Sequence, residues 1–97
     1  MTLRILYFAG LRDAVGLAEE TVELEALRAT HASGTSGHAQ DAAPTVRELA
    51  DHLAARHPAY RERRGHVRIA RNEAFAGDDE HLVDGDVVAL IPPVAGG

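Results

Sequence analysis

Two short apolar runs, one near each end of the 97-residue chain, constrain the fold most strongly. Leu3–Ala9 (LRILYFA) is apolar on both alternating faces apart from Arg4, and Val87–Ile91 (VVALI) is apolar throughout. A strand that is apolar on both faces must be covered on both faces, which places it inside a sheet. We therefore expect the two runs to lie side by side, and in parallel if a helix is part of the connection between them.

One main helix is expected between these runs. Thr45–His57 (TVRELADHLAARH) begins with Thr45 as a good N-cap, and Glu48 three residues later completes the pattern of a capping box. Its apolar side chains recur at helical spacing, and Pro58 follows directly as a stop signal. We expect the apolar stripe of this helix to pack on the sheet.

The remaining patterned segments predict shorter elements. Glu19–Leu27 alternates apolar and acidic residues, which indicates a half-exposed strand paired back onto the first one. Further elements are expected as a helical turn at Leu11–Val15, a strand at Val67–Asn72, a short continuation at Ala74–Ala76, and turns at Gly77–Asp79 and Asp84–Asp86. Together they predict an α+β fold, with a mixed sheet of four to five strands packed on one main helix.

Two polar segments interrupt this pattern. Ala29–Ala43 contains no large apolar residue, so it cannot bury enough surface to offset its ordering entropy, and we expect a flexible loop insertion. Its two histidines, His31 and His38, have no carboxylate cluster around them, which favours solvated side chains over metal ligands. Ala59–His66 is polar and basic, and we interpret it as a solvated connector.

The composition excludes several kinds of chemistry. The chain has no Cys and no Lys, so it can form no disulfide, no Cys-ligated zinc site and no lysine Schiff base. Its net charge of −5 argues against nucleic-acid binding and suits a basic protein partner. No apolar run approaches the ~20 residues that span a membrane. We expect a cytoplasmic protein with no metal site and no permanently bound cofactor.

The last six residues, Pro92–Gly97 (PPVAGG), form the most unusual segment. Two prolines directly after an apolar strand remove two backbone donors, so the chain is expected to leave the sheet there. The two glycines have no side chains and can enter a channel too narrow for any other residue. Fully extended, the segment reaches up to ~20 Å. It can thus deliver a terminal carboxylate into a partner, although tails of this kind are also often only frayed.

A carboxylate at this terminus needs activation before it can react, because its leaving group would be oxide. Coupling to AMP gives a mixed anhydride with a good leaving group. A sulfur nucleophile can then displace AMP and leave a thiocarboxylate on Gly97. Because the chain has no Cys, sulfur that it carries covalently must be carried at its terminus.

Four segments carry a family resemblance: Leu6–Asp13 (LYFAGLRD), Thr45-Val46-x-x-Leu49, Leu82–Ala89 (LVDGDVVA) and Pro92–Gly97 (PPVAGG). They resemble the small subunit of molybdopterin synthase, a ubiquitin-like β-grasp sulfur carrier, over nearly the whole chain except Ala29–Ala43. The resemblance implies a β-grasp domain at residues 1–91, with residues 29–43 as a loop insertion, and an extended tail at residues 92–97.

The same resemblance implies a function. A ubiquitin-activating-like adenylyltransferase would use ATP to adenylate Gly97, and a sulfurtransferase would supply the sulfur. The tail would insert into the large subunit of the synthase, within a heterotetramer, and would donate sulfur to cyclic pyranopterin monophosphate in molybdenum cofactor biosynthesis. The inserted residues would be Pro92, Pro93, Val94, Ala95 and Gly96. Acid–base residues would lie on the large subunit, so this chain would supply the reacting sulfur without catalytic side chains.

A partner-binding patch is expected on the sheet. If alternate residues of the two apolar runs face the helix, then Phe8 and Ile91 lie on the opposite face, where Phe75 can join them. An apolar face on so small a domain indicates a binding surface. Arg12 is either a charged residue at the rim of this patch or a solvated turn residue.

Other functions stay open at this point. A related carrier could deliver sulfur for thiamine, cysteine or tRNA thiolation. A ubiquitin-like modifier would instead join Gly97 to a lysine of a target protein, and a plain interaction domain would leave its tail inert.

Overall fold

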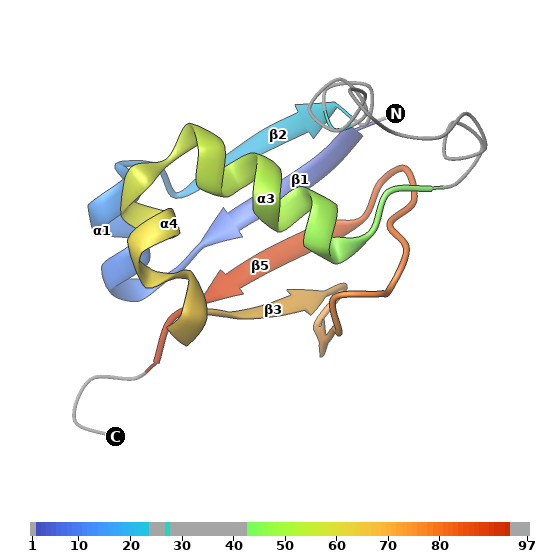
Figure 1. Cartoon of the computed structure of the whole chain (residues 1–97). Helices are drawn as coiled ribbons and strands as arrows, with labels where there is room; N and C mark the ends of the chain where they lie inside the picture. Colours follow the sequence, from blue (N-terminus) through green and yellow to red (C-terminus); the bar gives the residue numbers. More distant parts are fainter. Residues whose placement is uncertain (1, 24–26, 28–42, 94–97) are drawn as a thin grey trace.

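The computed structural model describes residues 2–23, 27 and 43–93. The expectations for residues 24–26 of the second strand, for residues 29–42 of the loop insertion with its two histidines, and for residues 94–97 of the tail lie outside this part of the chain. The elements, labelled as in Figure 1, are β1 (Thr2–Tyr7), α1 (Ala9–Val15), β2 (Glu19–Glu23), α3 (Val46–Arg56), α4 (Pro58–Arg63), the 3-10 turn η2 (Arg64–His66), β3 (Arg68–Arg71), β4 (Ala74–Phe75) and β5 (Val87–Ile91).

The five strands form one mixed sheet in the order β2-β1-β5-β3-β4. The two strands from the ends of the chain, β1 and β5, are parallel neighbours, and Ile5 lies opposite Val88. The other pairs, β1 with β2, β3 with β5 and β3 with β4, are antiparallel. The predicted α+β fold is confirmed, including the parallel central pair.

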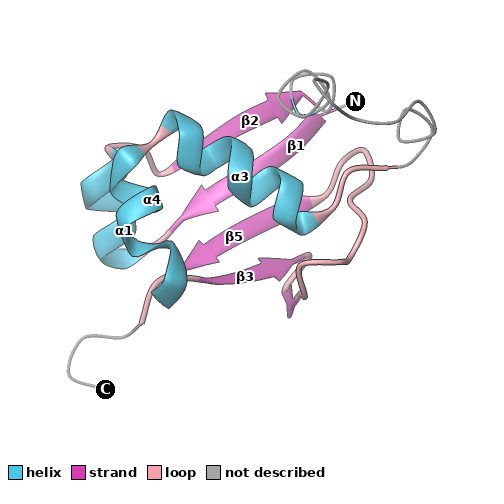
Figure 2. Ribbon diagram, viewed as in Figure 1, coloured by secondary structure: helices cyan, strands magenta, loops and turns pink. Residues whose placement is uncertain are grey.

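The core lies between this sheet and α3, which runs across one face (Figure 2). Ile5 and Tyr7 of β1 and Val88 and Leu90 of β5 are at most 2% exposed and belong to the core. Six buried residues of α3 face them: Val46, Leu49, Ala50, His52, Leu53 and Ala54. The expected orientation of the two central strands toward the helix is confirmed.

The main helix begins as its sequence predicts. The Thr45 hydroxyl accepts a hydrogen bond from the Glu48 backbone N–H at 3.2 Å, and the Glu48 carboxylate accepts one from the Thr45 N–H at 2.8 Å. This reciprocal pair satisfies backbone donors that have no partner inside the helix. The expected turns are also present. In one of them, Gly85 has a φ of 88°, and the Asp86 N–H donates to the Val83 carbonyl at 3.1 Å.

The prediction for Ala59–His66 is wrong, because this segment is the helix α4 followed by η2. Pro58 ends the first helix, but it is also the first residue of the second, a position where proline is favoured. Tyr60 then points into the core and is only 1% exposed. One aromatic side chain thus anchors a segment whose other residues are largely polar.

The first strand is shorter than predicted. It ends at Tyr7, and Phe8 becomes the N-cap of α1. Ala9 has a positive φ of 51°, a conformation that cannot continue a strand. The helical turn expected at Leu11–Val15 is present as the longer α1, which ends at Gly16 in the left-handed conformation.

Candidate functional site

The root of the tail lies at the end of a central strand. β5 ends at Ile91, and Pro92 and Pro93 follow, with Pro93 exposed. Gly97, which the sequence predicts to carry the thiocarboxylate, and the other expected tail residues, Val94, Ala95 and Gly96, lie outside the described residues. Because β5 is the middle strand of the sheet and pairs on both sides, with β1 and β3, the root follows a strand that is hydrogen-bonded along both edges.

The sheet face opposite α3 carries an apolar hollow that we call the open sheet face. Its lining residues are Arg4, Leu6, Phe8, Ala70, Asn72, Glu73, Phe75, Val87, Ala89 and Ile91. Phe8 is 45% exposed and Phe75 is 57% exposed, although both are large apolar side chains. The structure therefore brings together three of the residues expected in the partner-binding patch, Phe8, Phe75 and Ile91. Arg12 lies on α1, exposed, and does not line this hollow.

A second apolar hollow, which we call the tail-root groove, lies beside the two prolines. It is lined by Phe8, Ala9, Gly10, Leu11, Arg63, His66, Val67, Ile91, Pro92 and Pro93. α1, α4 and η2 thus meet the end of β5 at this groove. Phe8 and Ile91 line both hollows, so the open sheet face and the tail-root groove are continuous around the root of the tail.

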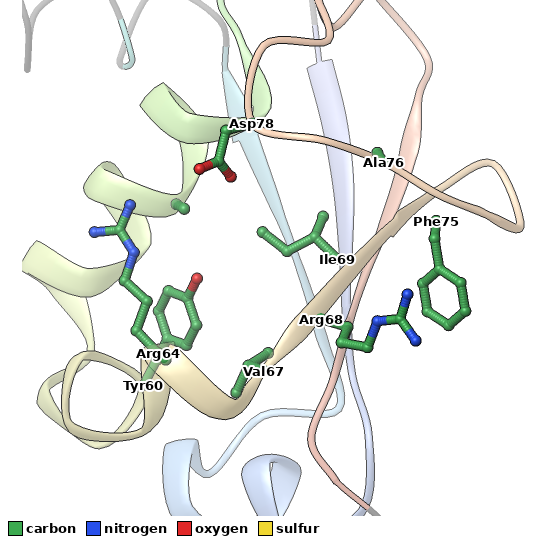
Figure 3. Close-up of a pocket in the computed structure, with 10 residues that line it drawn as sticks. Tyr60, Arg64, Val67, Arg68, Ile69, Phe75, Ala76 and Asp78 are labelled. Atoms are coloured by element: carbon green, nitrogen blue, oxygen red, sulfur yellow. The ribbon is translucent and has the colours of Figure 1, made fainter.

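A third hollow lies between α3, α4 and β3 (Figure 3). Its two arginines already have partners in the chain. Arg64 pairs with Asp51 at 2.6 Å, and the Arg68 guanidinium lies 3.7 Å from the centre of the Phe75 ring. Cation–π contact of this kind holds Phe75 in place at the rim of the open sheet face. Both arginines of this hollow are therefore already bound within the chain, and Arg68 helps to position Phe75 for the open sheet face.

Glu20 of β2 binds three side chains from β1 and from the C-terminal end of α3. Its carboxylate accepts hydrogen bonds from the Tyr7 hydroxyl and from His57 Nε2, the latter at 2.7 Å, and it pairs with Arg56 at 3.2 Å. Burial alone would raise the pKa of Glu20, but these hydrogen bonds and the positive charge of Arg56 outweigh it and lower the pKa. Burial and the bond to Glu20 raise the pKa of Tyr7 well above its usual value. The cluster ties the C-terminal end of α3 to β1 and β2.

Asp86 organises the start of β5. Its side chain accepts hydrogen bonds from Arg71 Nε at 2.7 Å, from Asn72 Nδ2 at 2.9 Å and from the Val83 N–H at 2.8 Å. Burial opposes ionisation, but these donors together keep the pKa of Asp86 below its usual value. Asn72 also accepts from the Val87 N–H at 2.9 Å. The carboxylate therefore joins the β3–β4 hairpin to the first residues of the strand that carries the tail.

Sequence reasoning missed both carboxylate clusters. It assigned Asp86 only to a turn, and it treated Glu20 as one acidic residue of an alternating strand. The partners of Glu20 lie 13 and 37 residues away in the chain, so no local pattern could pair them. A signal did exist for Asp86, because an acidic residue directly before an apolar internal strand must find donors when it is buried.

A mixed sheet packed on one main helix, with the C-terminal segment following a central strand, is the structure of a ubiquitin-like β-grasp domain. The model of the ThiS family matches residues 28–97, and the chain belongs to this family. It is 34% identical to the molybdopterin synthase sulfur carrier subunit of Chlamydomonas reinhardtii, with 100% of both chains covered. It is 31% identical to the Escherichia coli protein of the same name, covering 98% of this chain and 99% of that protein.

The crystal structure of the small archaeal modifier protein 1 of Haloferax volcanii has the same fold. It superposes with a TM-score of 0.74 at 28% identity, covering 100% of both chains. These findings confirm both the β-grasp fold and the resemblance to the small subunit of molybdopterin synthase. In the described part of the chain, no helix is long and apolar enough to cross a membrane.

Proposed function

We propose that this chain is the sulfur carrier subunit of a molybdopterin synthase. The observation that carries the proposal is that the sequence PPVAGG directly follows the central strand β5, whose residues Val87, Ala89 and Ile91 line the apolar open sheet face. The full-length similarity to two proteins named molybdopterin synthase sulfur carrier subunit supports it. A carrier needs a rigid body, a slender reactive end and a surface for its partner. The described residues supply the rigid body and the surface.

The chemistry takes place at Gly97. A carboxylate oxygen attacks the α-phosphorus of ATP on the activating adenylyltransferase, forms the acyl-adenylate and releases pyrophosphate. A hydrosulfide delivered by a sulfurtransferase then attacks the acyl carbon, and AMP leaves with the electron pair of the broken C–O bond. The product is a thiocarboxylate, whose sulfur is the nucleophile for the next transfer. This chain contributes no acid or base to these steps and binds no permanent cofactor.

The acceptor in this proposal is cyclic pyranopterin monophosphate bound to the large subunit. Gly97 lies four residues beyond Pro93, so an extended tail reaches roughly 13–14 Å from the body of the domain. That reach suits a buried acceptor site, and only small side chains and glycines pass through the narrow part of such a channel. Two small and two large subunits would form the working heterotetramer in the cytoplasm.

A protein modifier is the second candidate, and the similarity to the small archaeal modifier protein 1 favours it. Both functions begin with adenylation of the terminal glycine. They differ in the acceptor, which is a lysine amine for a modifier and a small molecule for the sulfur carrier. Carriers for thiamine, cysteine or tRNA thiolation share the thiocarboxylate and differ in the acceptor as well.

Reconstitution separates these candidates. The chain is incubated with its activating enzyme, ATP and sulfide, and the product is added to the large subunit with cyclic pyranopterin monophosphate. We expect formation of molybdopterin by the full chain and none by a variant that lacks Gly96 and Gly97, which retains every residue of the described fold. Formation of isopeptide-linked proteins without any molybdopterin would contradict the proposal and favour the modifier.

A further inference from the structure

The tail-root groove has a local charge opposite to that of the whole chain. Of its lining residues in the described part of the chain, Arg63 and His66 supply cationic or hydrogen-bond-donating groups, and none is acidic. The whole chain has 15 acidic residues against 10 arginines. The groove thus combines an apolar floor with positive charge at its rim, on a molecule whose net charge is −5.

The charge of Arg63 is available to a partner. Its Nη1 donates to the Ala59 carbonyl at 2.9 Å, a contact within its own helix that keeps the guanidinium near the groove. No carboxylate of the described residues forms an ion pair with it. The next arginine in the chain, Arg64, is in contrast bound to Asp51, and Arg71 is bound to Asp86. A guanidinium has five donors, so one intramolecular bond leaves room for a carboxylate.

The position of the groove indicates what can fill it. Pro92 and Pro93 line it, so a protein that takes up the residues beyond Pro93 must place the mouth of its channel here. The terminal carboxyl group lies up to roughly 13–14 Å further along an extended tail. The groove therefore meets the entrance of the partner's channel, and the reacting groups and any nucleotide lie beyond its reach.

The shared residues favour a stable partner over a transient one. Phe8 and Ile91 line both the tail-root groove and the open sheet face, so one protein can cover the two surfaces without a break. Continuous apolar contact of this kind is typical of permanent subunit interfaces, whereas transient encounters are smaller and more polar. Among the proteins that must take up the tail, the large subunit of the synthase fits this description best.

We propose that the tail-root groove is a second docking surface for the large subunit, distinct from the open sheet face. It receives an apolar segment at the mouth of the large subunit's channel, and an Asp or Glu of that segment pairs with Arg63 while His66 supplies a second donor. This inference rests on the proposed function, because it assumes that the tail enters the large subunit.

Charge reversal on α4 tests the proposal with a matched control. Arg63→Glu and Arg61→Glu make the same change in net charge on the same short helix, but Arg61 does not line the groove. Affinity for the large subunit of the same organism's synthase is measured by calorimetry at low and high salt. We expect Arg63→Glu to weaken binding by about tenfold or more and to reduce its salt dependence, and Arg61→Glu to change it by less than about twofold.

Arg63→Gln guards against misfolding of the reversed variant, since it keeps the shape and removes only the charge. It is expected to show an intermediate loss with an unchanged circular dichroism spectrum. Equal effects of the Arg63 and Arg61 variants, or a loss confined to the activating enzyme, would overturn the groove as a docking site for the large subunit. If sulfur transfer by the full chain persists in that case, the proposed function stands. If the full chain does not bind the large subunit at all, both proposals fail.

Discussion

Single side chains hold the strand that carries the tail. Asp86 is 3% exposed and accepts hydrogen bonds from Arg71, Asn72 and Val83, so one carboxylate joins the β3–β4 hairpin to the turn before β5. A buried acceptor of this kind is costly to remove, because its donors remain desolvated without partners. Asp86 therefore fixes the start of β5, the strand that ends at the root of the tail.

Replacement of Asp86 by Ala is expected to lower the free energy of unfolding by about 2–3 kcal/mol, since a guanidinium, an amide and a backbone N–H lose their acceptor. Urea unfolding followed by circular dichroism measures the change. Asp79→Ala is the control, because Asp79 is exposed in a neighbouring turn, and its effect should stay within about 0.5 kcal/mol. Similar losses for both variants would show that the Asp86 cluster contributes little.

Glu20 makes the free energy of unfolding depend on pH in the acidic range. Its pKa is lowered in the folded state, so between the folded and unfolded values the unfolded chain binds more protons. The contribution is therefore complete above the unfolded pKa of ~4.3 and is lost as the pH falls through the lower, folded value. Asp86 acts in the same direction.

Glu20→Gln tests this dependence. At pH 7 the variant should be about 1–2 kcal/mol less stable, because it loses the charge that faces Arg56 and His57. As the pH falls below ~4, the difference between the two proteins should shrink, since the wild-type carboxylate becomes protonated. Urea titrations at several pH values measure it. A difference that stays constant down to the lowest pH would contradict the assigned role.

At the scale of whole elements, local signals predicted the central features and failed where contacts are distant. β1, β5 and α3 were predictable because binary patterning and the capping box each act within a short window. α4 was not predictable, because a proline such as Pro58 is typical both of the residue that ends one helix and of the first residue of the next. The decision depends on the burial of Tyr60 against α1 and the sheet, which only the tertiary fold provides.

The contribution of the α3 N-cap, Thr45, to stability can be tested by substitution. Thr45→Ala removes the acceptor for the Glu48 N–H and is expected to cost about 1 kcal/mol, or a fall in melting temperature of roughly 4–8 °C. Thr45→Ser retains a hydroxyl and should restore most of the loss. Scanning calorimetry measures both. If the Ser and Ala variants melt together, the hydroxyl does not contribute.

At the scale of the molecule, the two faces of the sheet differ: one packs on the helices and the other is the open sheet face. α3 and its neighbours complete a core on one side, while Phe8 and Phe75 stay exposed on the other. The sequence patterning of β1 and β5 predicted this face, because both strands are apolar on both sides. The tail-root groove could not be predicted, since it forms where α1, α4 and η2 meet the end of β5.

Phe75→Ala tests the open sheet face as a partner surface. We expect it to weaken binding to the large subunit by about tenfold or more, as for an aromatic side chain at an interface, with little change in stability because the ring is 57% exposed. Val83→Ala is the control, since Val83 is a comparably exposed apolar residue, at 49%, that does not line this face. Calorimetric titration measures both. Equal affinities of the two variants would remove the open sheet face from the interface.

The intact mass of the chain after incubation with its activating enzyme, ATP and sulfide shows whether Gly97 carries the sulfur. We expect a mass increase equal to the exchange of one oxygen for one sulfur, with fragment ions that place the change on Gly97. The increase should be absent without ATP and in the variant that lacks Gly96 and Gly97. A chain of unchanged mass under conditions in which the activating enzyme consumes ATP, or sulfur located on any other residue, would contradict the proposed sulfur carrier function.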